Sequence, residues 1–242
     1  MRVLFKVQYL GTRYGGWQLQ VNALSVQQVI EEAMATLCRE PVRLHGAGRT
    51  DAGVHAMAQR AHADVPLGIP PRGLILGLNQ LLPRDIRITA AEVVADDFHA
   101  RFNATGKTYA YRIWNAEVAD VFRDETHALV ARPLDVERMQ DAAQAVAGTH
   151  DFRAFTVAEP EVSSTVRTIS SIEVVREGEA VVITVTGDGF LRNMVRRIAG
   201  SLIEIGSDRL DASAMTRSLP PGFEPARWTA PAKGLVLVDV HY

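Results

Sequence analysis

Apolar residues in this chain follow two different spacings, and the order of those spacings is what most limits the possible folds. The run from Arg2 to Tyr9 is short and rich in Val, Leu and Phe, which is typical of a buried strand. From Val26 to Leu37 the apolar residues recur three and four positions apart, which is typical of one helix face. Because each spacing favours one kind of element, the chain is predicted to mix strands and helices.

The first half of the chain gives the order strand, helix, strand, strand, helix, strand. Ser25 is expected to cap the first helix, because its hydroxyl can accept from the first turn while Gln28 reaches back. Pro70 and Pro71 open the second helix, where a missing N–H costs nothing, and Pro83 ends it. The strands are expected at residues 2–9, 42–47, 56–65 and 86–94.

The second half repeats this order with little similarity in sequence. Asp135 is a good N-cap for its first helix and Gly148 a good C-cap. A later helix is expected to run from Leu191 to Ile205, turning its apolar side inward and stopping at Gly206. The strands are expected at residues 107–114, 167–176, 180–187 and 235–240.

Two copies of this split βαβ order predict an α+β protein made of two ferredoxin-like, RRM-like halves. Each half is expected to form a mainly antiparallel sheet with helices on one face. The predicted domains are residues 1–105 and 106–242. Since no flexible linker separates them, the halves are expected to pack side by side around a central basic cleft.

Charge and cysteine content narrow the possible functions. The formal net charge is −2, so a nucleic-acid partner would have to be met by local clusters of arginine. Cys38 is the only cysteine, which excludes a disulfide within the chain. The N-terminal segment carries charges where a signal peptide would be apolar, and no apolar run is long enough to span a membrane. A soluble, cytoplasmic protein is therefore expected.

The glycine-dense stretch from His45 to His55 is the strongest candidate for chemistry. A phosphate-binding loop would continue with Lys and Ser or Thr, where this chain has Val54 and His55. A dinucleotide fingerprint would need a third glycine and a following helix. What remains is Arg49 and Asp51 on a tight turn between two strands. Asp51 could bond its own backbone in an Asx-type turn, or be a carboxylate held ionised by an arginine.

The sequence GRTDAGVH at 48–55 resembles the signature of the tRNA pseudouridine synthase A family. Further stretches match that family in the same order, so the resemblance covers nearly the whole chain. They are YGGWQLQ at 14–20, SVQ at 25–27, DFHARF at 97–102, KTYAY at 107–111, FLRNMVR at 190–196, GSL at 200–202 and GLVL at 234–237. Two positions depart from the family: Leu10 stands where an aspartate is usual, and Leu19 where a basic residue is common.

The resemblance implies isomerisation of uridine to pseudouridine at positions 38, 39 and 40 of the tRNA anticodon stem-loop. The glycosidic C–N bond breaks, the uracil turns while bound, and its C5 joins the sugar. No redox step or phosphoryl transfer is involved, so no cofactor and no metal are expected. Similarity to the family also implies a homodimer whose subunits share one tRNA.

The same match assigns roles to individual residues. Asp51 is implied to be the catalytic carboxylate, acting as nucleophile or base. Tyr109 is implied to stack on the uracil and assist proton transfer, and Arg49 to help hold the flipped nucleotide. Arg196 is implied to pair with Asp51 and lower its pKa. Further RNA contacts are expected from Arg13, Trp17, Gln18, Arg101, Lys107 and Arg192.

Several alternatives stay open at this point. Trp17 could pack inside the protein instead of stacking on RNA, and Arg192 and Arg196 could form an ordinary solvated helix face. A non-catalytic RNA-binding module on the same fold would need exposed strand aromatics, for which Tyr109 and Tyr111 are candidates. A small-molecule enzyme with Asp51 as general base is the third class, because fold alone does not decide function.

Overall fold

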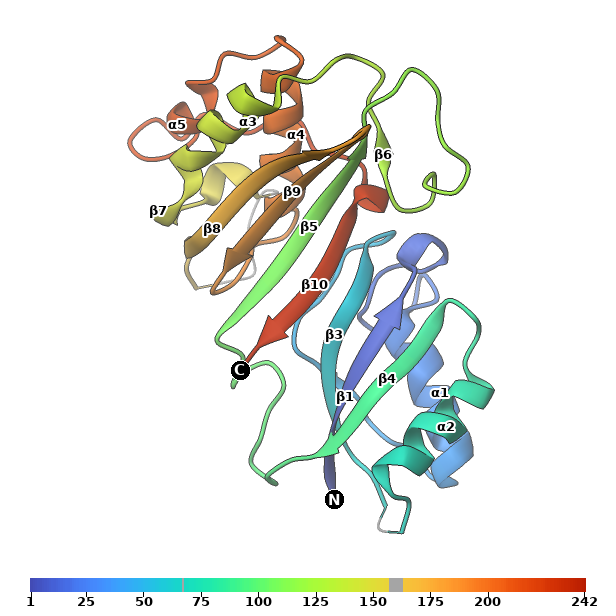
Figure 1. Cartoon of the computed structure of the whole chain (residues 1–242). Coiled ribbons are helices and arrows are strands. Elements are labelled where there is room, and N and C mark those ends of the chain that lie inside the picture. The colour runs from blue at the N-terminus through green and yellow to red at the C-terminus, as the bar shows by residue number, and fades with distance from the viewer. Residues whose placement is uncertain (67, 157–162) are drawn as a thin grey trace. The chain divides into compact units, whose positions relative to one another are not determined.

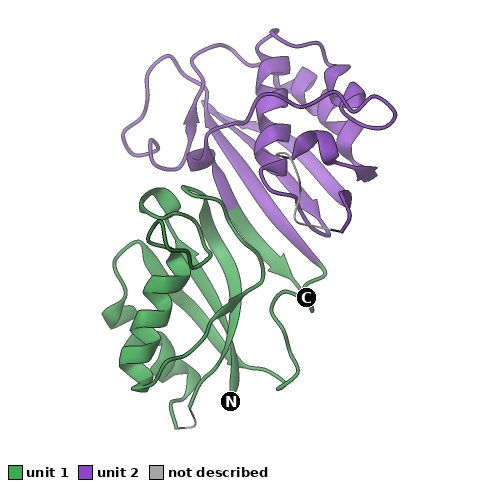
Figure 2. Ribbon diagram, turned by 180° about the vertical axis from the view of Figure 1, so that it is seen from behind, with its two compact units in different colours: residues 1–105, 237–242 green, residues 106–236 purple. Residues whose placement is uncertain are grey.

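A computed structural model describes residues 1–66, 68–156 and 163–242 of the chain. These residues form two compact units, shown in different colours in Figure 2. Unit 1 contains Met1–Thr105 and Leu237–Tyr242, and unit 2 contains Gly106–Val236. Helices accompany mostly antiparallel strands, which confirms the predicted α+β class (Figure 1). The finer description as two ferredoxin-like halves stays a prediction.

The sheet of unit 1 is built around its first strand. Strand β1 (Arg2–Tyr9) has the predicted bounds and pairs antiparallel with β3 (His55–Asp64) and with β4 (Ile86–Val93). The C-terminal strand β10 (Leu235–His241) lies next to β3, so the strand order is β4-β1-β3-β10. The last strand of the chain is thus part of the same sheet as the first strand.

The strand predicted at 42–47 is wrong for most of its length. Within this range only the two residues of β2 (His45–Gly46) are in a strand, which pairs with β3. The backbone at Leu44 is hydrogen-bonded to helix side chains instead: its N–H donates to Glu31 Oε1 at 2.9 Å, and its carbonyl accepts from Gln27 Nε2 at 3.0 Å. These bonds satisfy the backbone without a partner strand.

Two helices cover one face of the unit 1 sheet (Figure 1). Helix α1 (Val26–Cys38) begins as predicted, because Ser25 Oγ accepts from the N–H of Gln28 at 3.1 Å. The side chain of Gln28 does not complete the capping box, since it donates to Glu32 at 3.0 Å. Helix α2 (Pro71–Leu81) starts at the predicted proline. A short 3₁₀ turn, Gly11–Arg13, follows β1.

In unit 2 the strand order is β5-β9-β8-β7. Strands β5 (Gly106–Trp114), β9 (Ala180–Gly187) and β8 (Val166–Glu177) lie close to their predicted bounds and pair antiparallel. Strand β7 (Gly148–Asp151) extends the edge beyond β8, and β6 (Ala128–Leu129) pairs parallel with β5. Because they contain only a few residues each, β6 and β7 had no periodic signal in the sequence.

The helices of unit 2 lie on one face of its sheet (Figure 1). Helix α3 (Val136–Ala143) is capped by Asp135, as predicted, and passes into the 3₁₀ turn Gln144–Val146. The prediction that Gly148 caps this helix is wrong, since that glycine opens β7. The remaining helical segments are α4 (Met194–Gly206), α5 (Ala214–Arg217) and the 3₁₀ turns Arg153–Phe155 and Ala232–Gly234. Across residues 1–66, 68–156 and 163–242, every helix is too short or too polar to cross a membrane.

Candidate active site

The turn that carries Asp51 joins β2 to β3 in unit 1. Thr50 is buried, Asp51 is half-buried and Arg49 is exposed, so the two charged side chains of the motif lie at the surface. The N–H of Val54 donates to the carbonyl of Asp51 at 3.1 Å and closes the turn. Gly53 adopts a φ of 78°, a left-handed conformation that favours glycine. The motif therefore presents a carboxylate on a tightly closed turn.

The N-terminal loop passes directly beneath this turn. Gly16 has a φ of 101°, and a Cβ there would lie 2.5 Å from the carbonyl oxygen of Thr50. The next residue, Trp17, donates its N–H to the same oxygen at 3.1 Å. Its ring is only 1% exposed and lies against Gly46, where an added Cβ would be 2.4 Å from Trp17 Nε1. The Trp17 side chain therefore packs under the turn, which is the alternative to stacking on RNA that the sequence left open.

Polar side chains are buried below the turn as well. The Tyr9 hydroxyl is hydrogen-bonded to Thr50 Oγ1 at 2.8 Å, and Gln59 Nε2 donates to the carbonyl of Gly48 at 2.9 Å. Sequence analysis missed Tyr9 and Gln59. The available signal was a glutamine within β3, whose other inward positions are occupied mainly by alanine. A buried amide among small apolar residues needs hydrogen-bond partners, and here the turn provides one.

Asp85 supports the turn indirectly, through Arg13 and Tyr14 of the N-terminal loop. Its carboxylate accepts from Arg13 at 2.9 and 2.6 Å and from the Tyr14 hydroxyl at 2.9 Å. Burial raises the pKa of Asp85, but these donors outweigh it and hold the pKa below its usual value. Burial and the same carboxylate raise the pKa of Tyr14 to about 12. Since the carbonyl of Tyr14 accepts from Gly53 N–H at 3.3 Å, this ion pair supports the turn, and Arg13 has a structural partner.

Unit 2 contains Tyr109 and Tyr111, the two tyrosines that the sequence suggested as strand aromatics for RNA contact. Tyr109 lies on β5 opposite Val185, and its ring meets the Phe190 ring edge-on at 5.2 Å. Tyr111 is fully buried and donates its hydroxyl to the carbonyl of Pro231 at 2.9 Å. Burial raises the pKa of Tyr111 more strongly than the nearby Arg196 guanidinium lowers it. Tyr109 is 8% exposed, so neither ring is the exposed platform that a non-catalytic RNA-binding module would need.

Arg196 lies on the first turn of α4, with its guanidinium held at two points. Its Nε donates to the carbonyl of Ala230 at 2.8 Å, and a terminal nitrogen donates to Asn193 Oδ1 at 3.0 Å. Arg192 was predicted to lie on the same helix face, and this is wrong. The helix begins only at Met194, because Asn193 adopts a φ of 60° and separates Arg192 from it.

The other predicted RNA contacts lie at several places on the two units. Arg101 and Arg192 are exposed, whereas Gln18 and Lys107 are half-buried. The Arg101 guanidinium lies 5.8 Å from the centre of the Phe102 ring, a cation–π distance. The two family departures, Leu10 and Leu19, are partly exposed beside the N-terminal loop. RNA contact by Arg101, Arg192, Gln18 and Lys107 remains a prediction.

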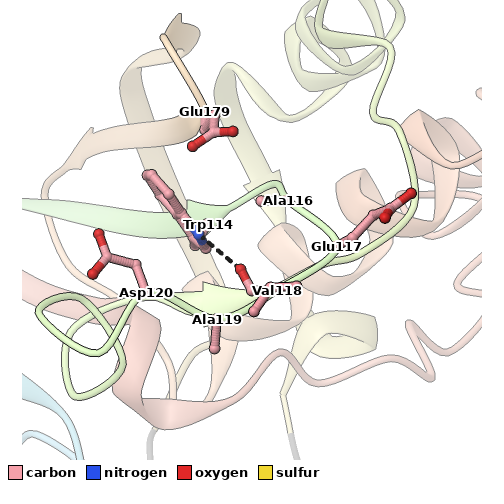
Figure 3. A pocket seen from close by; sticks show the side chains of 7 residues that line it. All are labelled: Trp114, Ala116, Glu117, Val118, Ala119, Asp120 and Glu179. Atoms are coloured by element: carbon pink, nitrogen blue, oxygen red, sulfur yellow. Dashed lines mark hydrogen bonds between the residues drawn. The ribbon is translucent and has the colours of Figure 1, made fainter.

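A surface hollow in unit 2 does not suit an RNA phosphate. It lies beside Trp114, whose indole N–H donates to the carbonyl of Val118 at 3.2 Å (Figure 3). Three of its lining residues are carboxylates, Glu117, Asp120 and Glu179, which repel an anion. Within the part of the chain that the structure describes, no three His, Cys, Asp or Glu side chains are grouped as a metal site.

Comparison with known proteins identifies the family to which this chain belongs. A family model described as tRNA pseudouridine synthase matches residues 6–103 and 142–242. The matched ranges include the Asp51 turn and helix α4 and together make up most of the sequence. The chain therefore belongs to the tRNA pseudouridine synthase family.

Individual relatives narrow this class further. A tRNA pseudouridine synthase A of Pelobacter propionicus is 44% identical over 237 residues, covering 98% of this chain and 97% of the relative. The protein of that name from Geotalea uraniireducens is 43% identical with the same coverage. A solved Cbf5-Nop10-Gar1 complex aligns with 84% of this chain and 45% of its own at 12% identity and a TM-score of 0.39, and similarity at this level supports no argument.

Proposed function

We propose that this tRNA pseudouridine synthase converts uridine to pseudouridine at positions 38, 39 and 40 of the tRNA anticodon stem-loop, with Asp51 as the catalytic carboxylate. The observation that carries the proposal is the turn from Gly48 to His55, which resembles the family signature and lies within the residues that the family model matches. It presents a half-buried carboxylate next to an exposed arginine. A carboxylate in that setting can act as nucleophile or base without a cofactor.

The other motif residues take roles that follow from their chemistry. Arg49 has a guanidinium suited to RNA phosphates and to the space that a flipped nucleotide leaves. Tyr109 offers an aromatic face for uracil and a hydroxyl for proton transfer. Arg196 supplies a fixed cation that favours an ionised carboxylate. These are proposals for the same reaction, and they rest on the match of each residue to the family's motifs.

Release of tritium from tRNA labelled at uridine C5 tests the activity and its position together, since C5 loses its hydrogen when it joins the sugar. The protein is expected to release tritium from unmodified tRNA. A transcript with cytidine at positions 38, 39 and 40 is expected to release none while binding equally well. Continued release from that transcript would contradict the proposed positions. No release from either transcript, with binding intact, would contradict the activity.

We further propose that the protein works as a homodimer. The chain has a net charge of −2, so two subunits that combine their local arginine patches would bind tRNA more strongly than one. Light scattering is expected to give twice the chain mass of 26.5 kDa at micromolar protein. A mass of one chain, measured under conditions in which the enzyme is active, would contradict the dimer.

A further inference from the structure

We propose that a buried hydrogen-bond network made by Tyr9, Thr50 and Gln59 positions Asp51 for the reaction. The inference rests on the proposed function, because it assumes that Asp51 is the reacting carboxylate. Tyr9 and Gln59 act through other groups and are positioning residues. The network belongs entirely to unit 1 and joins β1, β3 and the catalytic turn.

The geometry of the network places Tyr9 at its centre. Tyr9 is the last residue of β1, and its hydroxyl lies 2.8 Å from Oγ1 of Thr50, the residue just before Asp51. The side chain of Gln59 lies near the same hydroxyl and lowers its pKa, against the larger effect of burial. Gln59 also donates to the carbonyl of Gly48 at 2.9 Å. Gly48 and Thr50, both on the N-terminal side of Asp51, are thus hydrogen-bonded to side chains of β3 and β1.

Thr50 is held at two of its hydrogen-bonding groups. Its hydroxyl contacts Tyr9, and its carbonyl accepts from the N–H of Trp17 at 3.1 Å. Thr50 cannot rotate without breaking one of these bonds, and its branched side chain already restricts χ1. On the other side, the closing bond from Val54 N–H to the Asp51 carbonyl limits movement of the turn. The backbone that carries the carboxylate is therefore fixed from both directions.

Burial makes this network costly to break. Tyr9 is 3% exposed, Gln59 is fully buried and Thr50 is 7% exposed. A buried polar group that loses its partner keeps the whole cost of its desolvation, so the intact arrangement is strongly favoured over partly broken ones. Burial also raises the pKa of the Tyr9 hydroxyl, which stays protonated. Tyr9 therefore contributes a fixed position and no charge.

The consequence for catalysis is a matter of distance. Chemistry between a carboxylate and a sugar or base requires the reacting atoms at near-contact distance, and a displacement of about 1 Å can cost roughly 10²-fold in rate. Loosening Thr50 displaces the adjacent Asp51 while leaving its charge and the RNA-binding surface unchanged. The network therefore influences the chemical step much more than tRNA affinity.

Substitutions at Thr50 and Tyr9 test this inference through the single-turnover rate of tritium release. Thr50→Val keeps the shape and removes the hydroxyl, whereas Thr50→Ser keeps the hydroxyl. We expect Thr50→Val and Tyr9→Phe each to slow the reaction ~10- to 100-fold, with the Kd for tRNA unchanged within about twofold. Thr50→Ser is expected to stay within about threefold of the unsubstituted enzyme, because the hydrogen bond survives. The double variant should be no slower than the slower single one, since both changes break one interaction.

Tyr242→Phe is the matched control, because it also removes a phenolic hydroxyl that donates a hydrogen bond within unit 1. The acceptor is the carbonyl of Ala100 at 2.9 Å. It is expected to retain the rate. Folded Tyr9→Phe and Thr50→Val enzymes that react at the unsubstituted rate would overturn the inference, as would a Thr50→Ser enzyme as slow as Thr50→Val. Activity retained by Asp51 variants would contradict the proposed function, which assigns the reaction to that carboxylate. This result can be told apart from a failure of the inference, which is read from the Tyr9 and Thr50 variants.

Discussion

Replacing Asp51 with asparagine is expected to abolish pseudouridine formation while tRNA still binds. The amide has almost the same size and hydrogen-bonding reach as the carboxylate, but it has no charge and is a poor nucleophile and base. Loss of such a group typically costs on the order of 10³-fold or more in turnover. Tritium release measures turnover, and a filter-binding assay with unmodified tRNA measures affinity. Because Asp51 is half-buried at the surface, the thermal midpoint of unfolding of the variant should differ little from that of the unsubstituted protein.

Asp96→Asn is a suitable control for this experiment, because it makes the same chemical change at an exposed position of unit 1 outside the turn. It is expected to retain both activity and affinity. Pseudouridine formation by Asp51→Asn at close to the unsubstituted rate would show that another group carries the chemistry. Loss of binding together with turnover would instead assign Asp51 a role in holding the RNA.

The second large effect is expected at Arg196. Its planar guanidinium donates to the carbonyl of Ala230 and to Asn193 at once, which fixes the direction of the group. A lysine keeps the positive charge but loses the planar fork, so it cannot reproduce both bonds with the same orientation. We expect Arg196→Lys to lower turnover ~10²-fold, because a displaced cation stabilises developing charge poorly. The single-turnover rate of tritium release is the measurement.

Arg209→Lys provides the comparison for Arg196→Lys. Arg209 is exposed on unit 2, and its Nε lies 3.0 Å from a carboxylate oxygen of Glu204, so the same change is made at a surface position and keeps the positive charge beside that carboxylate. That variant should behave like the unsubstituted enzyme. Turnover by Arg196→Lys within about twofold of it would remove the guanidinium geometry from the reaction. A large fall in thermal midpoint without a change in rate would assign Arg196 to the stability of α4 alone.

Together the variants separate the charge of the carboxylate from its placement. Asp51→Asn removes the charge and leaves Thr50 and Tyr9 in their places, whereas Tyr9→Phe leaves the charge and loosens the support beneath it. Both slow the chemical step, but at the supporting position the conservative change Thr50→Ser should keep the rate, because its hydroxyl still meets Tyr9. This difference identifies which side chains react and which hold the reacting group in position.

Much of unit 1 and unit 2 follows from local sequence. The bounds of β1, the caps Ser25 and Asp135, and the proline start of α2 were predicted correctly, because strand alternation and helix capping involve residues a few positions apart. The turn that carries Arg49 and Asp51 was also recognised from a short stretch, since its glycines and charged residues are contiguous. Family membership followed from several such stretches in order.

Tertiary structure alone decided the features whose partners are distant in the sequence. Trp17 is buried because Gly46 leaves room for its ring, and the segment at Leu44 avoids a strand because α1 side chains satisfy its backbone. Tyr9 and Thr50 are 41 residues apart, and the last strand belongs with the unit that contains the first. Local sequence determined most of the elements and the short stretch in which the candidate catalytic residues lie. Burial and long-range hydrogen bonds determined which side chains support them, because those energies exist only once the chain has folded.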